Sequence, residues 1–223
     1  MSEWWTYSLS DFLMFSPRAY WRLFEQQLGA HRYAMWPLLA LLLAPWISRR
    51  PLTAQRWAGG SALLAGACLW VAWTFVVQRL GSIHWAMPNF AWAIATHALL
   101  ICFVIGDTLL RRPHRVNPRA AWLILALAIG YPLAGVLLGR QWNQIEFLGL
   151  TPDLTLLCTL VIPACLASRW RWLLLPVPLA WGLFSAATLW TLASKEWLMM
   201  LGALAVCLWA VWRVEPVGRL VGR

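Results

Sequence analysis

The chain has 223 residues, of which 61% are hydrophobic and only 12% are charged, and its formal net charge is +10 at pH 7. A soluble domain is roughly 45–50% apolar and about 25% charged. This composition therefore excludes a disordered chain, a disulfide scaffold and a coiled coil, and it argues against a water-soluble enzyme. The mean hydropathy of +0.64 instead predicts an all-α polytopic membrane protein, built as a bundle of transmembrane helices.

The first element that the sequence predicts is a short helix that Ser16 and Pro17 open and Gly29 closes. Ser is a favoured N-cap, proline fits the first helical position, and glycine suits the position after the last turn. The residues expected on its apolar face are Tyr20, Leu23, Phe24, Gln27 and Leu28. We interpret residues 1–32 as an outer-side segment whose amphipathic helix lies on the outer leaflet. A functional lid is the alternative.

Seven apolar runs follow, and short arginine-containing gaps separate most of them. A helix that crosses the hydrocarbon core needs about 20 largely apolar residues. The runs are residues 33–48, 57–77, 83–110, 120–139, 151–168, 172–193 and 197–212. They predict a seven-span bundle over residues 33–212, with the first and last spans the least certain to cross fully, and a basic tail over residues 213–223.

The charged residues between the runs are divided unevenly between the two sides of the bundle. One set of alternate gaps, with the tail, holds twelve arginines against two acidic residues, whereas the other set, with the N-terminal segment, holds six basic and six acidic residues. The positive-inside rule then places the N-terminus outside and the C-terminus in the cytoplasm. The membrane topology thus explains the positive net charge, and a nucleic-acid partner is not needed to explain it. We therefore expect the lipid bilayer as a partner and no nucleic acid.

The third run contains the most polar residues, namely Asn89, Thr96, His97 and Asp107. At 100° per residue, Asn89, Thr96 and Asp107 fall within about 20° of one another, and His97 lies about 80° from Asn89. Such a stripe is expected to face the bundle interior or a wet cavity, where polar groups are candidate functional residues. The four residues therefore define a candidate polar path for a substrate or a proton. The alternative is structural, with interhelical hydrogen bonds and Asp107 paired with a nearby arginine.

The sequence lacks the residues that several kinds of functional site require. The five cysteines form no C-x-x-C or C-C pair, which argues against a zinc site or a thiol relay. The single lysine, Lys195, stands at the edge of the last run, where it does not suit a retinal Schiff base in mid-membrane. The sequence contains neither an H-E-x-x-H motif nor a pair of intramembrane aspartates, so it does not indicate an intramembrane protease. We therefore expect no metal, no cofactor and no assigned catalytic residue.

Segments of the chain carry a recognisable pattern: W-W-T-Y-S-L-S-D-F-L-M-F-S-P-R-A-Y at 4–20, I-H-W-A-M-P-N-F-A-W-A-I-A-T-H-A-L-L at 83–100, and G-L-T-P-D-L-T-L-L-C-T-L at 149–160. With these segments the chain resembles a bacterial family of integral membrane proteins catalogued as domain of unknown function 6064. The resemblance implies a bacterial inner-membrane protein and brings no catalytic residue with it. It singles out a candidate outer-side motif formed by Asp11, Trp85, Thr151, Pro152 and Asp153.

Capping alone is sufficient to explain the Thr151-Pro152-Asp153 sequence, because it combines a capping hydroxyl, a proline at the first helical position and an acid in the first turn. Our leading hypothesis for the whole chain is a permease-like membrane protein with a small polar path along the third span. The first alternative is an accessory or scaffold subunit that binds a membrane-protein partner, or another copy of itself, through small-residue faces such as Ala58, Ala62 and Gly66. A second is a membrane enzyme that acts on a lipid or isoprenoid from the outer side, with Asp153, Glu146 or His97 as its working residue.

Overall fold

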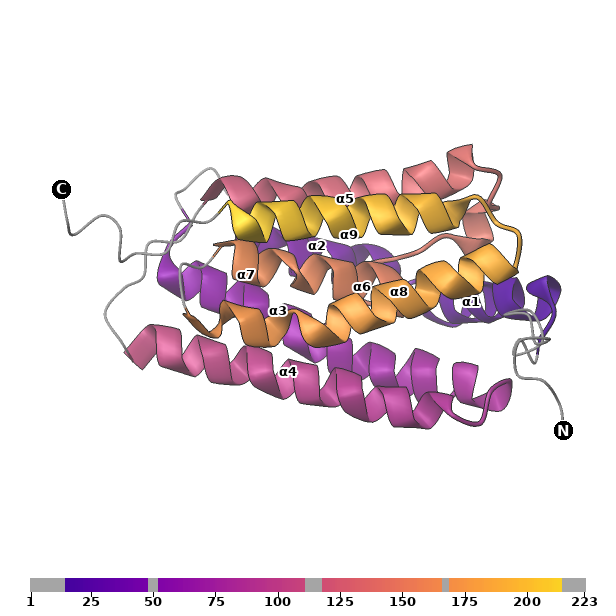
Figure 1. Cartoon of the computed structure of the whole chain (residues 1–223), viewed down its shortest axis with the longest axis horizontal. Coiled ribbons are helices and arrows are strands. Elements are labelled where there is room, and N and C mark those ends of the chain that lie inside the picture. The colour runs from indigo at the N-terminus through magenta and orange to yellow at the C-terminus, as the bar shows by residue number, and fades with distance from the viewer. Residues whose placement is uncertain (1–14, 48–51, 111–117, 166–168, 214–223) are drawn as a thin grey trace, which may run out of the picture.

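The structure is a computed structural model that describes residues 15–47, 52–110, 118–165 and 169–213. Within these ranges every regular element is helical, as the composition predicts. The elements are α1 (Pro17–His31), α2 (Met35–Ile47), α3 (Ala54–Val71), the π-helix η3 (Ala72–Val77), the 3-10 turn η4 (Leu80–Ser82), α4 (Met87–Leu110), α5 (Pro118–Leu137), the 3-10 turn η5 (Trp142–Gln144), α6 (Pro152–Thr159), α7 (Val161–Cys165), the 3-10 helix η6 (Arg169–Leu174), α8 (Pro176–Thr191) and α9 (Glu196–Trp212). After α1, the long helices run in alternating directions along the long axis of the molecule, and α6 and α7 follow each other in one direction (Figure 1).

Among the described residues, three helical stretches are long and apolar enough to cross a membrane, namely Ala54–Ser82, Met87–Leu110 and Trp170–Thr191. The other apolar helices are shorter. Helix α2, for example, has 13 residues, which span about 20 Å against a hydrocarbon core of about 30 Å. Each of the seven predicted runs is mainly helical, but length and composition support three crossings, and the seven-span arrangement stays a prediction.

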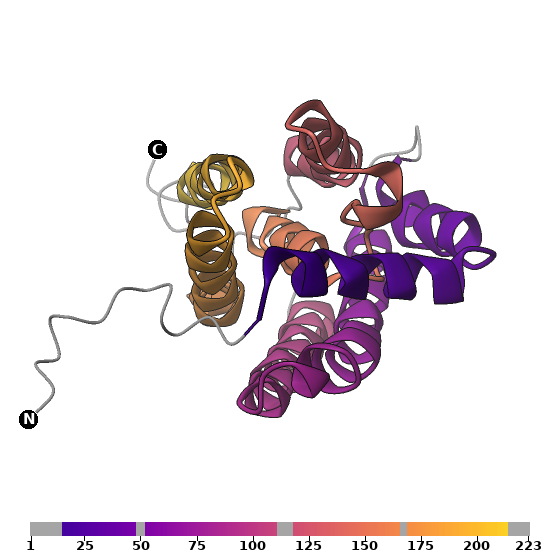
Figure 2. The same cartoon turned by 90° about the vertical axis from the view of Figure 1, so that its right-hand side faces the viewer.

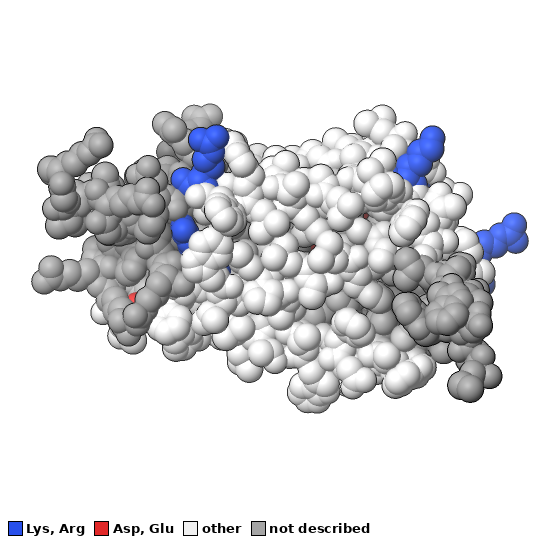
Figure 3. Space-filling view, in the orientation of Figure 1, with Lys and Arg blue, Asp and Glu red and all other residues white. Residues whose placement is uncertain are grey.

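The sides of the molecule expose large apolar side chains, among them Trp73, Trp92, Leu99 and Phe103. Figure 3 shows a side with few charged side chains between the Lys and Arg side chains that lie near the two ends of the long axis. Exposed apolar side chains on a surface with so few charges are unfavourable in water and favourable against lipid tails. The surface therefore agrees with a membrane protein.

Helix α1 begins where the sequence predicts it and buries the predicted face, but it continues past Gly29 to His31, so the predicted glycine end is wrong. The Ser16 hydroxyl accepts a hydrogen bond from the backbone N–H of Ala19 at 3.3 Å, and Pro17 takes the first helical position. The five predicted apolar-face residues are the buried residues of this helix. That face packs against the protein core rather than against lipid, and α1 lies across the ends of other helices (Figure 2). Its position at a membrane surface stays a prediction.

Helices α6 and α7 form the centre of the bundle, where every residue from Thr151 to Cys165 is buried. Helices α3, α5, α8 and α9 pack around them. The helix is interrupted between α6 and α7 because Pro163 has no N–H to donate and its ring clashes with the carbonyl of Thr159, four residues earlier. A polar side chain on this central helix is therefore removed from both water and lipid.

Candidate functional site

The predicted polar stripe on α4 does not face the interior. Asn89 and Thr96 are exposed on the outer surface, and the Thr96 hydroxyl donates to the carbonyl of Trp92 at 2.9 Å. A threonine that bonds to its own helix in this way needs no interior partner, which explains why it can stand on an apolar surface. The stripe was expected to line a path through the bundle, and its exposed members contradict that expectation.

The other two residues of the predicted path lie apart from this outer stripe. His97 is buried, and its Nε2 atom lies 2.9 Å from the hydroxyl oxygen of Thr159 on α6. This contact is the interhelical hydrogen bond of the structural alternative. Asp107 is half-buried near the C-terminal end of α4. The structure thus does not bring the four predicted residues together.

The candidate outer-side motif is also divided. Asp11 lies outside the described residues, and Trp85 is 73% exposed. Thr151, Pro152 and Asp153 are buried together at the start of α6. The Thr151 hydroxyl makes no cap bond to α6. Instead it accepts from the backbone N–H of Phe147 at 2.9 Å and donates to the Phe147 carbonyl at 3.1 Å, so the expected side-chain capping is wrong.

Asp153 is held by side chains of α8 rather than by the backbone of its own helix. The indole Nε1–H of Trp181 donates to Oδ1 at 2.7 Å, and the Ser185 hydroxyl donates to Oδ2 at 2.5 Å. The two donors stand four residues apart, so one face of α8 presents both to α6. Asp153 is only 3% exposed. Neutral donors on both oxygens stabilise a buried carboxylate without cancelling its charge.

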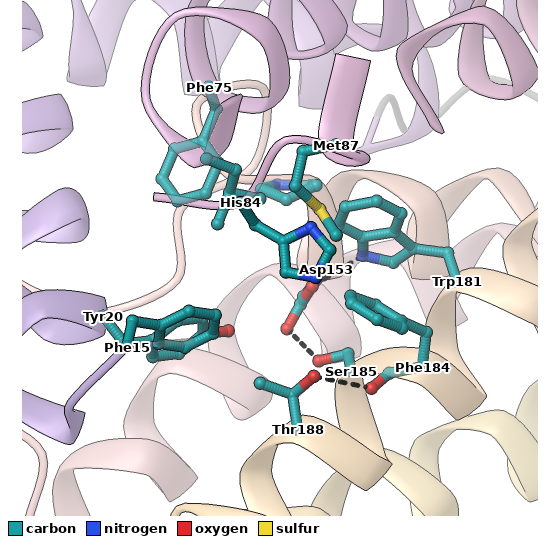
Figure 4. Close-up of a pocket in the computed structure, with 12 residues that line it drawn as sticks. Phe15, Tyr20, Phe75, His84, Met87, Asp153, Trp181, Phe184, Ser185 and Thr188 are labelled. Carbon is teal, nitrogen blue, oxygen red and sulfur yellow. Dashed lines mark hydrogen bonds between the residues drawn. The ribbon is translucent and has the colours of Figure 1, made fainter. Parts of the chain in front are cut away.

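A narrow cavity lies beside the Asp153 carboxylate (Figure 4). It has about 20 Å³ of space for water-sized contents, which is enough for about one water molecule. Its walls are mostly aromatic and apolar, with hydroxyl groups close to the carboxylate. The wall residues that matter for the chemistry are Phe15, Tyr20, Phe75, His84, Trp181 and Phe184. We call this space the Asp153 pocket.

A buried ion-pair cluster lies in the same part of the molecule. The left-handed backbone of Gly139, with φ of +104°, reverses the chain after α5, and Arg140 follows it directly. The Arg140 guanidinium donates from Nη1 to Oε1 of Glu146 at 3.2 Å and from Nε to Oε1 of Glu196 at 3.1 Å. Its Nη2 atom is also in ion-pair contact with Oε2 of Glu196. All three side chains are buried.

Helix α1 covers this cluster with aromatic rings. The Cζ atom of Arg140 lies 4.4 Å from the ring centroid of Trp21 and 5.4 Å from that of Phe24, distances typical of cation–π contacts. A 2.6 Å hydrogen bond from Gln144 to Glu25 ties α1 to η5. Helix α1 therefore covers the polar centre, and its roles as a lid or as a membrane anchor both stay predictions.

Gln27 fastens the same helix from its buried face. Its Nε2 atom donates to the Thr74 hydroxyl and to the Leu150 carbonyl, both at 3.1 Å. Its Oε1 atom accepts from Nε of Arg79 at 2.5 Å. Thr74 belongs to the π-helix η3, an element that often occurs at functional sites.

The electrostatic balance of this region is negative, because Glu146, Glu196 and Asp153 are buried near a single guanidinium. Burial raises the pKa of the Glu146 carboxyl to about 8, and the charge of Asp153 adds to the rise while Arg140 opposes it. Burial in this negative surrounding therefore favours the protonated form of Glu146 more than exposure to water would.

The sequence pointed to Asp153 in the candidate outer-side motif and to Glu146 only within the membrane-enzyme alternative. It missed Arg140 and Glu196, because these two residues stand in the short gaps between apolar runs and were counted there as loop charges. A usable signal was present, since only eight acidic residues occur in the chain and two of these flank predicted spans. Trp181 and Ser185, spaced four residues apart, were hidden in an apolar run.

Comparison of the chain with family models, with curated proteins and with solved structures finds no match. In the described ranges, no three His, Cys, Asp or Glu side chains converge in a way that would hold a metal ion. Function is therefore inferred from the geometry of the polar centre.

Proposed function

We propose that this chain is a multi-pass protein of the bacterial inner membrane, with its N-terminus outside and its C-terminus in the cytoplasm, and that it is permease-like. In this proposal the ligand site is the Asp153 pocket and not a path along α4. The ligand is a small molecule with a primary ammonium group. The observation that carries the proposal is the buried Asp153 carboxylate beside an aromatic-lined cavity.

The chemistry of the pocket favours a cation. An ionised carboxylate can accept about four hydrogen bonds, and Trp181 and Ser185 supply two of these to Asp153. The remaining acceptor sites suit the donors of an ammonium group. The faces of aromatic rings attract the same charge, and Phe15, Tyr20 and Phe184 supply such rings around the cavity.

The size of the pocket supports an ammonium group in particular. A space for one water molecule fits a single ammonium head and excludes a planar guanidinium or a quaternary ammonium group. The rest of the ligand would extend past Phe15 and Tyr20, which line the α1 side of the cavity. In this proposal, movement of these two side chains admits the ligand.

A second candidate function is the scaffold, and one observation favours it. Gly59, Ala62 and Gly66 are exposed on α3, and an added Cβ atom at either glycine would meet no atom within 4 Å. Small residues let helices approach closely in a membrane. A partner membrane protein, or a second copy of this chain, could bind against this surface without involving the Asp153 pocket.

The test of the permease proposal is a transport measurement on proteoliposomes by solid-supported membrane electrophysiology. A pulse of methylammonium is expected to give a transient current with the wild-type protein and none with Asp153→Asn. The matched control is Asp107→Asn, which removes a carboxylate from the far part of α4 and is expected to leave the current unchanged. Equal currents from wild type and Asp153→Asn, or no current from wild type, would overturn the proposal.

A further inference from the structure

We propose that Glu146 is a buried proton-binding site, in which the carboxyl group holds an exchangeable proton at neutral pH between Arg140 and Asp153. The ligand of this site is the proton itself. The inference goes beyond the proposed function because it requires neither transport nor an organic ligand.

The number of contacts that each glutamate receives from the Arg140 guanidinium identifies the carboxyl group that takes the proton. Glu196 receives two contacts from the guanidinium, at Nε and at Nη2, whereas Glu146 receives one, at Nη1. A two-point contact is the stronger and better-oriented form of an arginine–carboxylate pair. Glu196 is thus the ion-pair partner of Arg140, and Glu146 is left with a partial contact.

The second oxygen of Glu146 provides an independent observation. The residue is 1% exposed, and its Oε2 atom has no hydrogen-bond partner. An ionised carboxylate with one oxygen buried and unpaired carries a large desolvation cost. A proton on that oxygen removes the net charge and most of the cost, so the geometry favours the neutral acid.

The groups around Glu146 act in both directions. The negative charge of Asp153 on α6 favours a bound proton, whereas Arg140 and a hydrogen bond with the Thr151 side chain oppose it. Glu196 on α9 is the third carboxyl group of the cluster and is paired with Arg140. Tyr20 on α1 and Tyr131 on α5 are the other titratable groups that interact with Glu146. Three carboxylates and one guanidinium would leave two uncompensated negative charges in a buried space, and a proton on Glu146 halves that excess.

In the proposed topology, Glu146 lies near the outer end of the bundle, from which its proton would exchange. It follows η5 by two residues, and Gln141, Trp142 and Asn143 in that segment are exposed. Release of the proton breaks the carboxyl O–H bond, leaves the electron pair on the oxygen and passes the proton to water. No other reactant is needed, so the site would respond to the pH of the outer compartment.

Infrared spectroscopy of the purified full chain in detergent tests this inference, because a protonated carboxyl has a C=O stretch that the carboxylate lacks. We expect the wild type to show this band at pH 6 and to lose one carboxyl equivalent of it as the pH rises through about 8. Glu146→Gln is expected to lack that equivalent, and Glu196→Gln to keep a titrating band.

Two results would overturn the inference. One is a wild-type spectrum with no protonated carboxyl at pH 6, or with a band that does not titrate between pH 6 and pH 10. The other is the same titrating band in Glu146→Gln. The titration of the wild-type protein tests the inference even if a variant fails to fold. Because the spectra need no methylammonium, failure here is separate from failure of the transport test.

Discussion

The indole nitrogen of Trp181 and the carboxylate of Asp153 are joined by a 2.7 Å hydrogen bond across 28 positions of the sequence. The bond ties the central helix α6 to α8 and fixes a buried carboxyl group beside the Asp153 pocket. Ser185 completes the arrangement from the next turn of α8. These two hydrogen bonds hold Asp153, at the start of an apolar helix, in the wall of the pocket.

Removing the Ser185 hydroxyl should destabilise the protein. Ser185→Ala leaves Oδ2 of Asp153 buried without its donor, and hydrogen bonds to charged groups contribute about 1.5–3 kcal/mol. The expected loss of unfolding free energy is of that size, measured by thermal unfolding in detergent. Thr188→Val is the matched control, because its hydroxyl bonds to the Phe184 carbonyl of the same helix. An equal loss in both variants would contradict the assignment.

Gly149 should tolerate no side chain. Its φ is +82°, and an added Cβ atom would lie 2.7 Å from Cδ1 of Leu42 on α2. Gly149→Ala is expected to cost more than about 2 kcal/mol, from backbone strain and the clash together. Gly139→Ala separates the two effects, because Gly139 has φ of +104° and no atom within 4 Å of the added Cβ. It should cost only about 1 kcal/mol in the same thermal assay, and equal losses would argue against the α2 contact.

Replacing Ala193 with glycine should stabilise the folded protein. It has φ of +55° between α8 and α9, a conformation that costs an L-residue about 1–2 kcal/mol. Ala193→Gly is therefore expected to raise the unfolding free energy by about 1 kcal/mol. Ala187→Gly, within α8, should lower it by a similar amount because glycine weakens a helix interior. A lower midpoint for Ala193→Gly in thermal unfolding would contradict the left-handed turn.

Stability should fall as the pH rises from about 5 to about 8. The pKa of Glu146 is raised in the folded protein by burial, to about 8, so folding favours the protonated acid. The resulting stabilisation is complete below the unfolded-state pKa and is lost as the pH passes the folded-state value. Thermal unfolding at several pH values measures this effect. Glu146→Gln should flatten the dependence over this window, and an unchanged slope in that variant would assign the effect to another group.

Local sequence rules were sufficient for elements that depend on their own residues. Helix α1 has its cap at Ser16, its proline at position 17 and its buried face where the sequence predicts them. These features follow from spacing and from backbone chemistry alone. The helical class follows from composition in the same way.

Side-chain roles on the helices could not be predicted in the same way, because they depend on which face finds a partner. Asn89 and Thr96 share a helical face, but that face lies outward, while His97 faces α6 and finds Thr159. Helical periodicity shows which residues share a face, but it does not predict which neighbouring helix packs against that face.

The polar centre was the hardest part to predict, because its members come from distant segments. Arg140 meets Glu196 across 56 positions, and Asp153 meets Ser185 across 32. Such pairings depend on how α5, α6, α8 and α9 pack together. From a single sequence these residues appear as separate loop charges and an apolar run.

The central claim is that the Asp153 pocket binds an ammonium group. Its most direct test is equilibrium dialysis of radiolabelled methylammonium against the purified full chain in detergent. We predict saturable binding by the wild type and by Asp107→Asn, and at least a tenfold weaker affinity for Asp153→Asn, provided that variant elutes as a folded protein. Binding of equal affinity by wild type and Asp153→Asn, or no saturable binding by wild type, would contradict the claim.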